Sequence, residues 1–94
     1  MKIRVQYTGQ LRSAIGRAED DLDLPESTSL LLLLRELAKR HGERAAPHLA
    51  TAGGDVPCGL LIVRNGTALA ASDAMKTPLA CGDTITLLPP IAGG

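Results

Sequence analysis

Polar and apolar residues alternate first over residues 2–8, and this period of two predicts a β-strand. A second alternation over residues 18–24 predicts another strand, which Pro25 ends because proline cannot donate to a sheet ladder. Residues 9–17 contain two glycines and no periodicity, so we expect a turn or loop there. The two strands are therefore predicted to form a hairpin.

The best helical pattern covers residues 29–41. Thr28 or Ser29 can cap its start, and Gly42 stands where a left-handed residue commonly ends a helix. At about 100° per residue, one arc collects the apolar side chains and one histidine, which are Leu30, Leu33, Leu34, Leu37, Ala38 and His41. Leu32 falls among the charged residues, so we expect it to be exposed or covered by something other than the sheet.

The second half of the chain predicts three further strands. A continuous apolar run over residues 59–64 is typical of a central strand, and the Asn-Gly pair after it predicts a tight turn into a short strand over residues 68–70. A Gly-Asp turn precedes the last strand, residues 84–88. The connection over residues 43–57, with room for one helical turn, and residues 71–80 are predicted to be irregular.

This order of elements predicts one domain over residues 1–94, of the α+β class, in which the helix covers one face of a sheet. Within the last strand, Ile85 and Leu87 should face the core, and Leu88 should lie on the open face with the threonines of that strand. Leu88 would then form an apolar patch with whichever pair of the central strand points outward, either Leu61 and Val63 or Leu60 and Ile62.

The composition limits the functions that the surface can serve. One tyrosine is the only aromatic residue, and ten basic residues balance ten acidic ones. Nucleic-acid binding usually needs a basic stripe with stacking aromatics, so we expect no nucleic-acid partner. The leucine run Leu30–Leu34 is far shorter than the roughly 20 apolar residues that cross a membrane, and the first residues do not resemble a signal peptide. We expect a soluble, cytoplasmic protein without a membrane partner.

Four residues of the types that bind metals have no recognised zinc-site spacing, namely His41, His48, Cys58 and Cys81. Two cysteines are also too few for a disulfide framework. We expect both cysteines to be ordinary small apolar residues. His41, on the apolar flank of the helix, is expected to be a partly buried packing residue rather than a ligand.

Residues 89–94 form a tail that can carry chemistry. Pro89 and Pro90 cannot extend the ladder and favour an extended rod, and six residues at roughly 3.3 Å each reach about 20 Å. Gly93 and Gly94 have no side chains, so their backbone can pass a narrow channel. We expect a free carboxylate on Gly94, which adenylation would turn into an acyl donor. By itself, a Gly-Gly end is equally typical of a frayed terminus.

The last fourteen residues, CGDTITLLPPIAGG, closely resemble the MoaD/ThiS family of ubiquitin-like sulfur carriers. The Gly-Asp turn, the alternating strand, the Pro-Pro pair and the final Gly-Gly occur together and in order. The first strand, the Gln10-Leu11-Arg12 segment, the helix and the Val-Arg-Asn-Gly turn also match, so that the resemblance leaves out only residues 43–57. It implies the β-grasp fold, with a mixed sheet of four to five strands and one main helix packed on one face.

The resemblance also implies a chemistry for the tail. In this family an E1-like adenylyltransferase of the MoeB/ThiF type uses ATP to adenylate the residue that matches Gly94, and sulfur then converts it into a thiocarboxylate, with Gly93 beside it in the reactive tail. The Pro-Pro pair favours the branch in which the carrier inserts its tail into the large catalytic subunit of molybdopterin synthase. The chain would be the small subunit or co-substrate of that enzyme, without catalysis of its own and without a bound cofactor. Its expected docking residues are Leu88, Pro89, Pro90 and Ile91.

Three alternatives stay open. The same carrier chemistry can serve cysteine synthesis, thiamine synthesis or tRNA thiolation. The chain can be a ubiquitin-like modifier that is joined to lysines through Gly94. It can also be a non-reactive β-grasp interaction domain.

Overall fold

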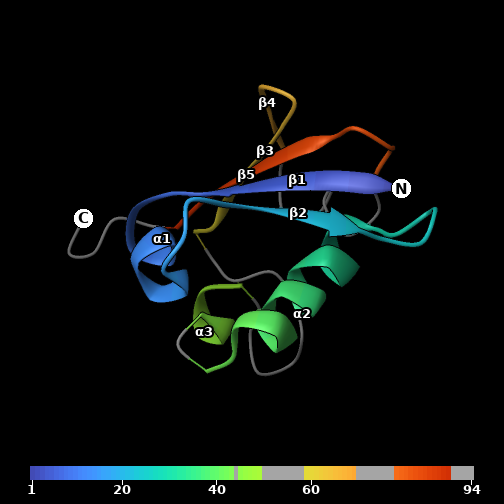
Figure 1. Ribbon diagram of the computed structural model, residues 1–94. Coiled ribbons are helices and arrows are strands. Elements are labelled where there is room, and N and C mark those ends of the chain that lie inside the picture. Colours follow the sequence, from blue (N-terminus) through green and yellow to red (C-terminus); the bar gives the residue numbers. More distant parts are fainter. Residues whose placement is uncertain (44, 50–58, 70–77, 90–94) are drawn as a thin grey trace.

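The computed structural model describes residues 1–43, 45–49, 59–69 and 78–89 (Figure 1). Five strands form one sheet, and they are β1 (Lys2–Tyr7), β2 (Glu19–Asp23), β3 (Leu61–Arg64), β4 (Thr67–Leu69) and β5 (Thr84–Leu88). The helices are α1 (Gly9–Ile15), α2 (Leu30–His41) and α3 (Ala46–Leu49). None of the helices in these residues is long and apolar enough to cross a membrane.

The strands lie in the order β2-β1-β5-β3-β4, so the last strand of the chain occupies the middle of the sheet. β5 is parallel to β1 and antiparallel to β3, whereas β2 pairs with β1 and β4 with β3 in antiparallel fashion. The sheet is therefore mixed, and the α+β prediction is confirmed. The predicted antiparallel pairing of the first two strands is also confirmed, although a helix rather than a turn or loop connects them.

The helices all lie on one side of the sheet (Figure 1), and the aliphatic core fills the space between the two layers. α2 contributes Leu30, Leu33, Leu34 and Leu37, all fully buried. Ile85 and Leu87 of β5 point into the same core, and Leu88 is only partly buried on the opposite face. The predicted orientation of the last strand is thus confirmed.

Residues 9–17 correct the prediction of a turn or loop. Gly9–Ile15 form α1, which Gly16 ends in the left-handed conformation. Leu11 is fully buried and Ile15 packs against the core, an i, i+4 pair on one helical face. Seven residues are too few to show a helical period, and a helix this short depends on packing rather than on propensity. The expectation of one main helix holds for α2, and α3 is the helical turn for which residues 43–57 had room. The rest of the predicted irregular connections falls largely on residues 50–58 and 70–77, which lie outside the described residues.

α2 begins at the predicted cap and ends at Gly42, which has a positive φ of 75° but not the predicted left-handed conformation, because its ψ is −163°. The Ser29 side chain accepts a hydrogen bond from the N–H of Leu32 over 3.3 Å, and the N–H of Gly42 donates to the Ala38 carbonyl. Leu32 was expected to be either exposed or covered by something other than the sheet. It is 51% exposed, so the first alternative holds. Asn65 and Gly66 both have positive φ, as the predicted tight turn between β3 and β4 requires.

Candidate functional site: the open face of the sheet and the base of the tail

The predicted site residues fall into two groups. Leu88 ends β5 and Pro89 follows it, and both are partly buried. The other four expected site residues lie outside the described residues, namely Pro90, Ile91, Gly93 and Gly94. The structure therefore describes the base of the predicted tail and the surface around it.

An apolar patch lies on the face of the sheet that the helices leave open. Leu61 pairs with Leu88 across β3 and β5, and Val63 lies two residues further along β3 on the same face. Leu61 is 45% exposed, while Leu60 and Ile62 are buried. Of the two pairs considered from the sequence, Leu61 and Val63 thus point outward. We call Leu61, Val63 and Leu88 the apolar patch, and it adjoins the base of the tail.

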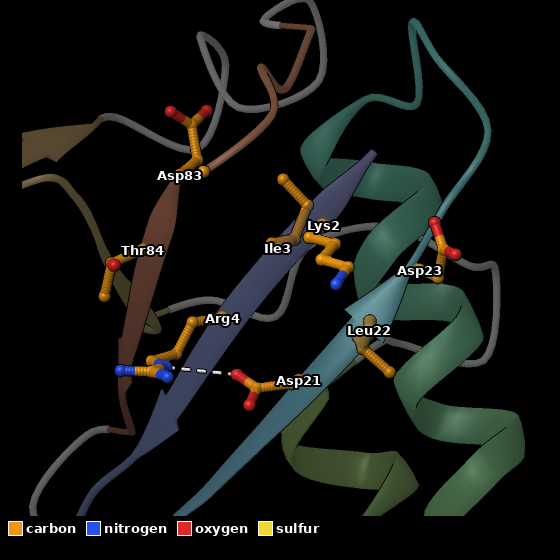
Figure 2. A pocket seen from close by; sticks show the side chains of 9 residues that line it. Lys2, Ile3, Arg4, Asp21, Leu22, Asp23, Asp83 and Thr84 are labelled. Atoms are coloured by element: carbon orange, nitrogen blue, oxygen red, sulfur yellow. Dashed lines mark hydrogen bonds and ion pairs between the residues drawn. The ribbon is translucent and has the colours of Figure 1, made fainter.

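The other half of the open face is polar. Arg4 donates from Nε to Oδ1 of Asp21 over 3.0 Å, and Thr86 donates to Gln6. A hollow of about 540 Å³ lies over this half, and Figure 2 shows the side chains of Lys2, Arg4, Asp21 and Asp23 around it. The hydrogen bond to Asp21, with its charge, raises the already high pKa of Arg4, so the guanidinium stays charged. The open face therefore joins a charge-balanced half to an apolar half.

The Val-Arg-Asn-Gly turn and the Gly-Asp turn meet in space around the buried carboxylate of Asp83. Arg64 donates from Nε to Oδ2 over 2.9 Å, Asn65 donates from Nδ2 to Oδ1 over 2.9 Å, and the N–H of Ala80 donates to Oδ2 over 2.8 Å. Asn65 also accepts from the N–H of Thr84. Burial raises the pKa of Asp83, but these hydrogen bonds and the Arg64 charge outweigh it and hold the pKa below its ordinary value.

This cluster fixes the start of β5, the strand that ends at the base of the tail. The sequence contains both turns, but each was interpreted by itself as a turn. Their union depends on β3 and β5 being neighbours, and 19 residues separate Arg64 from Asp83 along the chain.

A second polar cluster is buried between the sheet and α2. Tyr7 donates from its hydroxyl to Oδ2 of Asp20 over 2.7 Å, and His41 Nε2 lies 2.7 Å from the same oxygen. Arg17 Nη1 lies 3.0 Å from Asp20 Oδ1, and the Tyr7 and His41 rings pack edge to face. Burial and the bond to Asp20 raise the pKa of Tyr7.

His41 is partly buried, and its packing against Tyr7 confirms the prediction for this residue. The burial of Asp20 was not predicted, although the sequence contains a signal for it. Asp20 lies two residues before the inward-facing Leu22, so the strand alternation places a carboxylate on the core side.

Neither cluster has the composition of a metal site. No group of three or more histidine, cysteine, aspartate or glutamate residues that could hold a metal occurs among residues 1–43, 45–49, 59–69 and 78–89. Cys81 is a free thiol exposed just before β5, and Cys58 lies outside the described residues.

Comparisons with known proteins agree with this geometry. The model of the ThiS family matches residues 5–94. A search of curated proteins found no match.

Among solved structures, a putative molybdopterin-converting factor subunit 1 from Pyrococcus furiosus is 27% identical, with a TM-score of 0.75 over 97% of this chain and 99% of that chain. Small archaeal modifier protein 1 of H. volcanii is 20% identical, with a TM-score of 0.80 over 96% and 98%. Subunit 1 in the complex of subunits 1 and 2 of molybdopterin-converting factor from Helicobacter pylori is 24% identical, with a TM-score of 0.59 over 100% of both chains. The fold is the ubiquitin-like β-grasp, as the resemblance in sequence implied.

Proposed function

The chain belongs to the ThiS family, and on that basis we propose that it is a sulfur carrier whose working group is the carboxylate of Gly94. The family match carries this proposal, because it extends to residue 94 and so includes the Gly-Gly end. The central position of β5 and the apolar patch beside its last residue support it. They suit a domain that docks on a larger protein and delivers a tail to it.

The proposed reaction has three steps. The Gly94 carboxylate attacks the α-phosphorus of ATP on an E1-like adenylyltransferase, which forms an acyl-adenylate and releases pyrophosphate. A persulfide sulfur then displaces AMP, and reductive cleavage of the sulfur–sulfur bond by a thiol leaves a thiocarboxylate on Gly94. The carrier contributes the acyl group and the recognition surface, whereas ATP is bound by the activating enzyme.

For the acceptor we propose a pterin precursor of the molybdenum cofactor. The Pro-Pro pair favours this branch, and two of the similar structures are molybdopterin-converting factor subunits. One of them is in complex with its subunit 2, so a large catalytic subunit is the partner that we propose for this chain. Both proteins would act in the cytoplasm.

Conjugation to lysines is the second candidate. Its support is the likeness of fold to small archaeal modifier protein 1. Modification of other proteins would use the same acyl-adenylate, with an amine in place of sulfur as the attacking group. Carriers for cysteine, thiamine or tRNA thiolation would share the thiocarboxylate and differ only in the acceptor.

Intact-protein mass spectrometry tests the proposal. The chain is incubated with ATP, an E1-like enzyme, a persulfide donor and a reducing thiol, and we expect a mass gain equal to the replacement of one oxygen by sulfur, localised to Gly94 by fragmentation. A variant that lacks Gly94 should gain nothing. An unchanged wild-type mass, under conditions in which a known carrier is converted, would overturn the proposal.

The two candidates separate in a second measurement. The thiocarboxylated chain should support molybdopterin formation when the pterin precursor and a large catalytic subunit are added. A modifier should instead form conjugates with lysines that survive denaturation and reduction and that disappear in the variant without Gly94.

A further inference from the structure

Thr8 lies at the junction between β1 and α1, beside the end of β5. It is the N-cap residue of α1, where a threonine hydroxyl commonly accepts a hydrogen bond from a backbone N–H of the first turn. Here the side chain makes no capping bond. Its hydroxyl instead donates to the carbonyl of Leu87 over 3.0 Å. The group that could stabilise its own helix thus binds the tail-bearing strand.

The carbonyl of Leu87 is the next acceptor in the ladder of hydrogen bonds between β1 and β5. The N–H of Arg4 donates to the carbonyl of Asp83, and in the parallel pair of β1 and β5 such donors recur at every second residue. The same pattern leads from residue 8 to Leu87. The pairing of β1 with β5 ends at Tyr7, and the Thr8 hydroxyl continues it by one hydrogen bond as the backbone turns into α1.

Two further contacts enclose the end of β5. Gly9 has a φ of +54°, and a β-carbon built on it would lie 3.8 Å from Cγ of Pro89, so the start of α1 stands against the first residue of the tail. On the other side, Leu88 pairs with Leu61 of β3. The last described residues are therefore held from both neighbouring strands.

We propose that Thr8 is a positioning residue for the reaction at Gly94. By holding the Leu87 carbonyl, its hydroxyl fixes the end of β5 and with it the position of Pro89, the first residue of the tail. This inference rests on the proposed function of the tail. A displacement of about 1 Å at a reacting group can lower a rate by about a hundredfold, so the position of the strand that bears the tail should affect the rate at Gly94.

The test compares Thr8→Val, which keeps the shape and removes the hydroxyl, with Thr8→Ser, which keeps the hydroxyl. Thr67→Val is the matched control, because Thr67 is an exposed threonine of β4 whose pairing partner Arg64 lies at the opposite end of β3 from Leu61. The rate of adenylation by an E1-like enzyme is measured from the release of pyrophosphate. The assay temperature is well below the unfolding midpoint of each variant, so that lost stability alone does not alter the rate.

We expect Thr8→Val to lower kcat by about three- to tenfold, the effect of one lost hydrogen bond, with KM unchanged because the apolar patch is intact. Thr8→Ser should restore kcat to within about twofold of the wild-type value. The control Thr67→Val should have the kcat of the wild type. In the free proteins, the amide order parameter of Leu88 should fall in Thr8→Val and recover in Thr8→Ser.

The outcomes distinguish a failure of the positioning role of Thr8 from a failure of the proposed sulfur-carrier function. A wild-type kcat in Thr8→Val, or an equal loss in Thr8→Ser, would overturn the positioning role while the wild-type chain is still adenylated. A wild-type chain that is not adenylated, beside a known carrier that is, would overturn the proposed function itself. An unchanged order parameter at Leu88 would overturn the anchoring without reference to any reaction.

Discussion

Arg64 donates from Nε to Oδ2 of Asp83 over 2.9 Å, and this ion pair joins the last residue of β3 to the residue that precedes β5. The pair is mostly buried, with 26% of the Arg64 side chain and 7% of the Asp83 side chain exposed. A buried carboxylate that accepts several hydrogen bonds contributes more to stability than an ion pair on the surface, because its removal leaves the donors without a partner. The two ends of β5 are thus secured by different means, Asp83 at its start and Thr8 near its end.

Removal of the Asp83 carboxylate should destabilise the fold strongly. In Asp83→Ala, the donors from Arg64, Asn65 and Ala80 lose their acceptor, and we expect the free energy of unfolding to fall by about 2–3 kcal/mol. Urea denaturation measures this change. The control is Asp21→Ala. The Asp21 side chain is 70% exposed, so its removal should lower the free energy of unfolding by less than about 1 kcal/mol. Equal losses in the two variants would contradict the importance of the cluster.

The same carboxylate should make stability depend on pH at the acid end. The pKa of Asp83 is lower in the folded chain than its ordinary value of 3.8, so the folded state favours the ionised form. Its contribution is therefore fully present above the unfolded pKa and is lost as the pH falls through the folded pKa. Unfolding free energies of the wild type and Asp83→Asn, measured from about pH 7 down to about pH 2.5, should converge as the pH falls. A constant difference over this range would rule out the expected linkage.

A charge placed on the apolar patch should disturb docking more than folding. Leu61 is 45% exposed, so Leu61→Arg should lower the free energy of unfolding by no more than about 1 kcal/mol. We expect KM for the activating enzyme to rise at least about tenfold, which corresponds to about 1.4 kcal/mol of binding. Leu32→Arg is the matched control, because Leu32 is similarly exposed but lies on α2, in the helical layer on the other side of the sheet from the apolar patch. A similar rise in KM for both variants would argue against the open face of the sheet as the docking surface for the activating enzyme.

The hydroxyl of Tyr7 should stabilise the buried cluster around Asp20. In Tyr7→Phe, Asp20 loses a donor at 2.7 Å, and we expect a loss of about 1–2 kcal/mol in urea denaturation. Lys2→Ala, an exposed substitution on the same strand, should change stability by less than about 0.5 kcal/mol. A loss no greater than that of the control would show that the hydroxyl contributes nothing.

Ionisation of Tyr7 should be coupled to unfolding. Burial and the bond to Asp20 raise its pKa above the ordinary value of 10.0, so stability is complete below that pH and declines as the pH rises above it. Because Tyr7 is the only tyrosine and there is no tryptophan, the tyrosinate absorbance reports on this one group. The absorbance should appear together with the loss of far-ultraviolet circular dichroism. Its appearance in the folded protein near pH 10.0 would contradict the raised pKa.

Local patterns were sufficient for most of the elements, since hydrophobic alternation and helical spacing report directly which side of an element is buried. The orientation of Ile85, Leu87 and Leu88 followed from the period of two, and the Asn-Gly turn followed from the need for positive φ. α1 could not be found in this way. It is short, starts at a glycine with positive φ, and forms because Leu11 finds a buried position under the sheet.

By itself, the sequence determined the strands, the main helix, the outward position of Leu88 and the family resemblance of the Pro-Pro and Gly-Gly end, because each depends on residues close together in the chain. The tertiary structure alone decided that Leu61 rather than Leu60 accompanies Leu88, that Tyr7 and His41 meet at the Asp20 carboxylate, and that Thr8 binds the Leu87 carbonyl. These relations arise when β5, the last strand, inserts between β1 and β3. No local period records which distant strand will become a neighbour.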